Sequence, residues 1–443
     1  MVAPFDSTGG RWTRREFLGA LALELLAAVW SDAAPRSRLR VGFIAPTRSG
    51  FSPVRVGAAL QVAGDAGRWG AEMAAEEIDP TSLNPDAERF QFLPASAPDP
   101  RTALLQARRL VASERAVALV GGFDDETAAL LAQEAERRRV VYLNVGATSD
   151  ALRGERCGRY TFHVMPSAAM LLDAAATWFA GEEVQTPRGM RTRRRPVQTL
   201  FVIRQDSAWG KALEARAEGA LRKAGWRGRI VGRLSVKPDL PDYYRVLQAV
   251  QRARPELVWL LLDATAQLDF VDQAESFGLQ AEVSGFPDAP AQTYSFLSAV
   301  HDASRRLSTG VRPSAWDLGL PGAAFRISYR FRERWGQPMG GVSWTCWAAL
   351  HLLWRAAASA GSTEPDRLVR ALEVTSFEGG KGRALTFRRW DHQLRQPLYL
   401  VRARHDPKDV PWDLVEVVGV VPGPAEDLDR LGDDRTATRC TII

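Results

Sequence analysis

The chain has 443 residues, of which 46% are hydrophobic and 25% charged, so it can bury a large core, and large-scale disorder is excluded. The formal net charge of +6 comes mainly from arginines spread along the chain, and no nucleic-acid recognition motif accompanies them. We therefore interpret the charge as a mildly basic, soluble surface and expect no nucleic-acid partner.

The amino terminus has the pattern of an export signal. Arg14 and Arg15 precede a modest apolar run over residues 18–30, an order similar to twin-arginine signals. The run is too short to span a membrane and contains Glu24, which is costly in hydrocarbon. We expect residues 1–36 to form a twin-arginine-type signal segment, with an ordinary surface helix as the alternative. Whether the signal is cleaved stays open.

From residue 39, short apolar runs alternate with segments that have apolar residues at helical spacing, which predicts an α/β fold with parallel sheets. Strands are expected in a first half at residues 39–45, 90–93, 117–120 and 140–143, and in a second half at residues 199–203, 230–235, 257–262 and 282–285. Helices are expected at residues 69–78, 101–113 and 127–138, up to residue 180, and at residues 209–224, 243–252 and 266–277.

After residue 285 helices dominate, and short extended pieces follow. The helices are expected at residues 294–307, 322–335, 344–360 and 365–372, and the extended pieces at 384–388, 398–402 and 414–420. Residues 182–196 contain five arginines and are interpreted as a solvated insertion, or alternatively as a docking patch for an acidic partner or lipid headgroups. Residues 421–443 are rich in Pro, Asp and Arg and are expected to be a loosely held tail.

Catalytic and metal-binding signatures are missing. There is no nucleophile elbow, zinc-protease helix motif or dinucleotide glycine fingerprint, and the five histidines are scattered. Cys157, Cys346 and Cys440 have no metal spacing, so one disulfide with a free thiol and three unpaired thiols both stay open. We expect no enzyme activity, no cofactor and no metal.

Residues 117–150 place two turns at the carboxyl ends of neighbouring strands, where ligands bind in open parallel sheets. Asp124, Asp125 and Thr127 stand at the start of a helix, whose free N–H groups and dipole favour an acceptor. Consecutive acids at 124–126 repel an anion, so we expect a ligand with an amine, amide or hydroxyl group facing this turn. The alternative is that one aspartate caps the helix.

This stretch resembles the type I periplasmic substrate-binding proteins of branched-chain amino acid and amide ABC transporters, which are leucine-binding-protein-like. They carry a similar glycine turn, helix, strand and Ala-Thr-Ser turn. The resemblance continues in residues 206–211, 270–279 and 347–361. It implies two Rossmann-like lobes with parallel sheets, joined by a three-segment hinge. Lobe 1 would comprise residues 37–165 plus 286–376, lobe 2 residues 166–285 plus 377–405, and residues 406–443 would be a C-terminal extension.

The resemblance also implies site residues. In the amino-acid binders the first turn carries small hydroxyl residues that help hold the ligand carboxylate, whereas this chain has aspartates there. Three further features match the family: the second ligand turn, an aromatic residue against the ligand, and two acids where the ammonium group is held. For the turn and the acids the alternative is helix capping, and for the aromatic residue it is core packing. These residues are Ala147, Thr148, Ser149, Trp209, Asp263 and Asp288.

The implied function is that of an extracytoplasmic solute-binding protein in the periplasm, exported by the twin-arginine machinery. It would capture a small polar ligand, such as an amino acid, an amide or a related compound, and deliver it to the permease subunits of an ABC importer. A ligand sensor of the same fold, and a folded periplasmic enzyme or its accessory protein, are the alternatives. Arg48 and Ser49 are further candidates for the mouth of the cleft.

Overall fold

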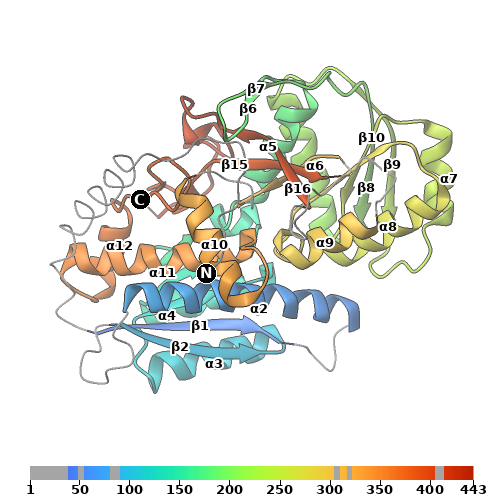
Figure 1. Ribbon diagram of the computed structural model, residues 1–443. Coiled ribbons are helices and arrows are strands. Elements are labelled where there is room, and N and C mark those ends of the chain that lie inside the picture. The colour runs from blue at the N-terminus through green and yellow to red at the C-terminus, as the bar shows by residue number, and fades with distance from the viewer. Residues whose placement is uncertain are drawn as a thin grey trace, which may run out of the picture.

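The computed structural model describes residues 38–47, 54–79, 90–303, 310–316, 322–404 and 414–442. Two parallel sheets stand apart, each flanked by helices, and the chain passes between their regions three times (Figure 1). The predicted α/β fold, with two Rossmann-like lobes on a three-segment hinge, is therefore confirmed. Arg48 and Ser49 lie outside the described residues.

The first sheet has the order β2-β1-β3-β4-β5, and all its strands are parallel. Its strands are β1 (Leu39–Pro46), β2 (Phe90–Ala97), β3 (Ala118–Gly121), β4 (Val141–Asn144) and β5 (Thr161–His163). Alternate residues of β1 point to opposite faces: Phe43 packs in the core shared with α2 (Val54–Ile78), and Ile44 packs toward α3 (Pro100–Ala112) and α4 (Asp125–Arg138). The fifth strand was not predicted, because a three-residue strand carries no periodic signal.

Helix α2 begins at Val54, well before the predicted start at residue 69. Its glycines lower the intrinsic helix propensity and so conceal the helix in the sequence. The reason for one of them is steric, since a Cβ atom on Gly70 would lie 2.0 Å from the carbonyl oxygen of Ser343. Glycine thus lets α2 lie directly against α11 (Gly341–Ala360).

The second parallel sheet has the order β11-β10-β8-β9. Its strands are β8 (Thr199–Gln205), β9 (Arg229–Val236), β10 (Leu257–Leu261) and β11 (Glu282–Gly285). The helices of this half are α5 (Ala168–Phe179), α6 (Ala208–Lys223), α7 (Tyr244–Ala253) and α8 (Ala264–Phe277). All four strands and all four helices agree with the elements predicted for the second half.

The later helices pack on both halves. Helix α11 lies in the core of the first sheet, with α10 (Ala323–Trp335) and α12 (Pro365–Leu372) beside it. Helix α9 (Tyr294–Ala303) instead packs against α8 of the second half (Figure 1). The lobe boundaries inferred from the sequence therefore stay a prediction.

A third, antiparallel sheet was not predicted. Its order is β12-β15-β16-β6-β7. The strands are β12 (Arg312–Ser314), β15 (Leu398–Ala403), β16 (Val415–Val421), β6 (Val184–Gln185) and β7 (Arg191–Thr192), and a small hairpin is formed by β13 (Thr386–Phe387) and β14 (Leu394–Arg395). The arginine-rich residues 182–196, predicted as a solvated insertion, contain a hairpin that extends this sheet, and four of their five arginines are exposed.

The prediction of a loosely held tail is wrong for the described residues up to 442. Cys440 forms a disulfide with Cys157, and Leu431 is buried. Buried Arg388 donates hydrogen bonds to the carboxylate of Asp429 and to the carbonyl oxygen of Leu431. Partners so distant in the chain leave no local pattern in the sequence. Cys346 is a buried free thiol, so the structure has one disulfide and one unpaired cysteine.

Candidate functional site

A cavity of about 480 Å³ lies between the carboxyl ends of the two parallel sheets. Its wall comes from the turns after β3 and β4, the turns after β8, β10 and β11, and residues Ala59 and Leu60 of α2. Most of the predicted site residues line it: Asp124, Asp125, Ala147, Thr148, Trp209, Asp263 and Asp288. Thr127 lines a neighbouring cavity, and Ser149 lines neither.

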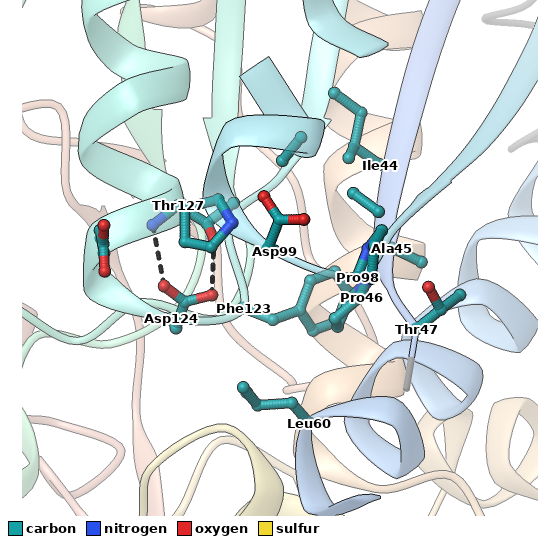
Figure 2. Close-up of a pocket in the computed structure, with 14 residues that line it drawn as sticks. Ile44, Ala45, Pro46, Thr47, Leu60, Pro98, Asp99, Phe123, Asp124 and Thr127 are labelled. Carbon is teal, nitrogen blue, oxygen red and sulfur yellow. Dashed lines mark hydrogen bonds between the residues drawn. The ribbon is translucent and has the colours of Figure 1, made fainter. Parts of the chain in front are cut away.

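Asp124 is the N-cap of α4. Its carboxylate accepts hydrogen bonds from the backbone N–H of Thr127 at 2.8 Å and from the Thr127 hydroxyl at 2.7 Å (Figure 2). These bonds satisfy a free donor of the first helical turn. Asp124 and Thr127 therefore have the capping role that was the alternative to ligand contact, although the Asp124 side chain also borders the cavity.

Asp125 connects the two predicted turns. Its Oδ1 accepts hydrogen bonds from the backbone N–H groups of Thr148 at 3.1 Å and Ser149 at 3.0 Å. The backbone N–H of Ala147 is also used internally, because it donates to the carbonyl oxygen of Gly122 and to the side chain of Asn144. The donors that the second turn would offer to a ligand carboxylate are thus occupied, two of them by a carboxylate of the protein itself.

Arg153 holds the turn at residues 147–149 in place, and it was not identified as a site residue from the sequence. It is 5% exposed, and its guanidinium donates to the carbonyl oxygens of Ala147, Ser149 and Met165. Burial lowers the pKa of Arg153 to about 10, and the charges of nearby carboxylates, including Asp125, oppose that shift. Burial also raises the pKa of Asp125, against the opposing effects of the Ser149 N–H and the Arg153 charge. No local motif marks this arginine.

Asp263 and Asp288 meet at the amino terminus of α8. Asp263 caps the helix by accepting from the backbone N–H of Ala266 at 3.0 Å. Asp288 accepts from the N–H of Ala264 at 3.1 Å and of Ala291 at 3.0 Å. Burial, followed by the negative charge of Asp263, raises the pKa of Asp288 to about 7, and Asp125 adds to the effect from the first lobe.

Trp209, in the first turn of α6, lies between core and cavity. Its ring contacts the buried ring of Phe286 edge-on, with centroids 5.7 Å apart and an interplanar angle of 79°. The indole is partly buried and lines the cavity, so Phe286 fixes its orientation. Both interpretations from the sequence therefore apply: the side chain of Trp209 packs on the core residue Phe286 and also lines the cavity.

The lining of this cavity is strongly acidic. Among the residues that the structure describes, five carboxylates and no lysine, arginine or histidine border it; the acids are Asp124, Asp125, Glu126, Asp263 and Asp288. Gln205, Ser207 and Thr265 add neutral polar groups that sequence reasoning did not single out. Within the described ranges, no group of His, Cys, Asp and Glu is arranged to hold a metal ion, and no helix is long and apolar enough to cross a membrane.

Comparison with known proteins gives the same fold. A family model described as periplasmic binding protein matches residues 39–408. Leu/Ile/Val-binding protein homolog 7 of Brucella abortus is 22% identical over 370 residues, which cover 80% of this chain and 86% of the homolog.

Solved structures are similar over nearly the whole chain. A branched-chain amino acid ABC transporter periplasmic ligand-binding protein from Burkholderia xenovorans has a TM-score of 0.75 at 18% identity, covering 91% of this chain and 100% of that one. A solute-binding protein of an ABC transporter from Rhodopseudomonas palustris, in complex with 3,4-dihydroxybenzoic acid, has a TM-score of 0.68 at 18% identity, covering 86% and 96%. The family model spans most of the chain, and the chain therefore belongs to the periplasmic binding protein family.

Proposed function

We propose that this protein captures a small solute in the cavity between its lobes and delivers it to the permease of an ABC importer. The solute presents an amine, amide or hydroxyl group to the first turn, not a carboxylate. The observation that carries this proposal is the hydrogen bonding of Asp125 to the N–H groups of Thr148 and Ser149. An incoming carboxylate would find those donors occupied and would lie beside a negative charge.

Capture follows from the hinged architecture. A ligand that contacts both lobes binds the closed form more tightly than the open form, and so shifts the population toward closure. Asp125 belongs to the first lobe, whereas Trp209 and Asp288 follow strands of the second sheet. A ligand held among these three side chains would therefore join the lobes. No bond is made or broken in this function, and we propose that the protein is not an enzyme.

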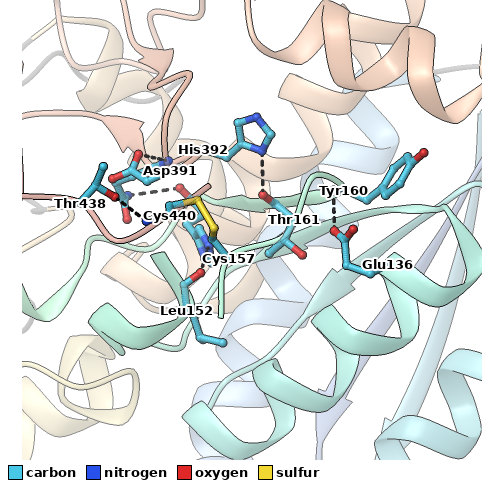
Figure 3. The surroundings of a disulfide bond; sticks show 11 residues. Glu136, Leu152, Cys157, Tyr160, Thr161, Asp391, His392, Thr438 and Cys440 are labelled. Carbon is cyan, nitrogen blue, oxygen red and sulfur yellow. Dashed lines mark hydrogen bonds between the residues drawn. A yellow bond between two sulfur atoms is a disulfide. The ribbon is translucent and has the colours of Figure 1, made fainter. Parts of the chain in front are cut away.

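Membership of this family implies a periplasmic location. The finer proposal is export by the twin-arginine machinery, supported by Arg14 and Arg15 ahead of the apolar run. The disulfide between Cys157 and Cys440 supports export as well (Figure 3), because disulfides persist in oxidising compartments.

A thermal-shift screen tests the proposed function. Amines, amides and polyamines are expected to raise the unfolding temperature, whereas aromatic acids lacking an amino group are not. A ligand at 100 times its dissociation constant adds about 2.7 kcal/mol to the free energy of unfolding, which is readily measured. If none of these compounds shifts the transition of a folded, empty protein, or if only acids do, the proposed capture of an amine or amide is wrong.

Trp209→Ala is expected to weaken binding of the best compound at least about tenfold, mostly through faster release, because the aromatic side chain that borders the cavity is lost. Calorimetry measures the affinity, and circular dichroism checks that the variant is folded. A folded variant that binds as tightly as the parent protein would place Trp209 outside the site.

The pH dependence of binding tests the carboxylates that follow strands of the second sheet. Since the pKa of Asp288 is about 7, an amine should bind about tenfold more weakly at pH 6 than at pH 8, as Asp288 becomes protonated. The contribution of Asp288 to the stability of the protein without ligand has the opposite pH dependence: because its pKa is raised on folding, this contribution increases as the pH falls from about 7 toward about 4. Asp288→Asn should flatten the affinity profile and remove this contribution to stability. An unchanged affinity profile in this variant, measured by calorimetry, would exclude Asp288 as the titrating group.

A further inference from the structure

The segment from residue 422 to residue 440, which we call the strap, lies beyond residue 408, where the match to the family model ends. It packs in two hydrophobic cores. Leu428 is buried in the cluster that contains β1 of the first sheet, and Leu431 is buried in the cluster that contains β8 and β10 of the second sheet. The strap therefore adds a connection between the two halves to the three passages that the main chain makes.

Helices of the second half hold the middle of the strap. The backbone N–H of Gly432 donates to the carboxylate of Asp173 on α5 at 2.9 Å, and Lys223 on α6 donates to the carbonyl oxygen of Gly432 at 3.0 Å. Lys223 also forms an ion pair with Asp173, which is buried. Because a buried carboxylate is costly without such partners, this attachment is hard to break.

Asp433 extends the attachment toward the first half. Its carboxylate pairs with Arg216 on α6, and the same guanidinium lies 3.6 Å from the carboxylate of Asp150. Asp150 follows β4 of the first sheet, and its other oxygen accepts from the backbone N–H of Ala169, at the start of α5, at 3.0 Å. Arg216 thus joins the strap to the place where the chain first passes between the halves.

The end of the strap is bonded covalently to the first half. Cys440 forms the disulfide with Cys157, which lies between β4 and β5 of the first sheet (Figure 3). Before this bond the strap folds into a compact turn, because the carbonyl oxygen of Asp434 accepts from the N–H groups of Ala437 and Thr438 at 3.2 Å and 3.1 Å. The strap therefore has little slack between its attachments to the two halves.

Two main-chain segments make the same connection. Residues 161–165 lead from the first sheet toward α5, and residues 392–396 lead into β15. The backbone N–H of His163 donates to the carbonyl oxygen of His392 at 2.9 Å, and the side chain of Gln396 donates to the carbonyl oxygen of Val164 at 2.7 Å. We call these paired segments the hinge pair. Any bending between the halves moves the hinge pair and the strap together.

We propose that the strap restrains the hinge pair, and that the disulfide between Cys157 and Cys440 is the removable part of this restraint. A dithiol attacks the disulfide through a mixed disulfide and becomes a disulfide itself, while two electrons and two protons pass to Cys157 and Cys440, which become thiols. The end of the strap is then released, and the halves keep their cores but move more freely. This inference concerns the protein without ligand and does not depend on the proposed function.

Hydrogen exchange, followed by mass spectrometry on the full-length protein, measures the restraint. Reduction with dithiothreitol is expected to speed exchange in peptides that contain residues 161–165 and 392–396 at least about threefold, because the hinge pair opens more often. Exchange in β3 and β10, inside the two parallel sheets, should keep its rate. The double variant Cys157→Ser with Cys440→Ser should show the same fast exchange without reductant, and dithiothreitol should then change nothing further.

Arg216→Gln tests the attachment of the strap while the disulfide stays intact. It removes the pairing with Asp433 and Asp150, so exchange in the hinge pair should rise here too. Arg222→Gln on the same helix is the matched control, because the Arg222 side chain is 74% exposed and contacts only Glu218 among the ion pairs of the described residues. This control should keep the rates of the parent protein.

Unchanged exchange in the hinge pair after complete reduction, with the thiols counted by mass spectrometry, would overturn the inference. An equal rise in β3 and β10 would also overturn it, because the disulfide would then only stabilise the fold as a whole. Parent rates in Arg216→Gln would contradict the attachment through α6. Circular dichroism checks that every sample is folded, and reduction of the parent protein decides the question if a variant does not fold.

Discussion

The site depends on one internal interaction, the carboxylate of Asp125 on the backbone N–H groups of Thr148 and Ser149. It joins the turn after β3 to the turn after β4 and fixes the shape of the first lobe's side of the cleft. Arg153 lowers the free-energy cost of burying this carboxylate, because its buried guanidinium attracts the carboxylate charge. The guanidinium also donates hydrogen bonds to carbonyl groups of the same turn. A buried carboxylate without such partners would be strongly destabilising.

Asp125 is also one of five carboxylates that border the cleft among the described residues. Asp125 follows a strand of the first sheet and lies close enough to Asp288, which follows β11 of the second sheet, to raise its pKa, so these carboxylates repel each other when both are charged. A cationic ligand bound between them, as we propose, would reduce this repulsion and contact both lobes at once. Closure would then depend on the ligand's charge. A positively charged ligand would bind the closed form more tightly than the open form, and this difference in affinity would shift the population toward closure.

The sequence was informative where a structure is local. The parallel sheets, the turns at 124–127 and 147–149 and the helix starts at Asp263 and Trp209 all follow from short-range patterns of apolar, glycine and capping residues. It was uninformative where partners are distant. The bond from Asp125 to Thr148 spans 23 residues, the disulfide joins residues 283 apart, and neither has a local signature. The first part of helix α2 was not predicted, because its glycines lower helix propensity and their role in close helix packing is visible only in the folded structure.

The most direct measurement compares two ligands that differ by one carboxylate, pentylamine and norleucine, in the parent protein and in Asp125→Ser. The parent is expected to bind pentylamine at least about tenfold more tightly, because the turn cannot accept a second carboxylate. Asp125→Ser frees the two backbone donors and removes a charge, so the preference should disappear or reverse. Equal or tighter binding of norleucine by the parent, with its carboxylate on the Thr148 and Ser149 N–H groups in a crystal structure, would contradict the role given to Asp125.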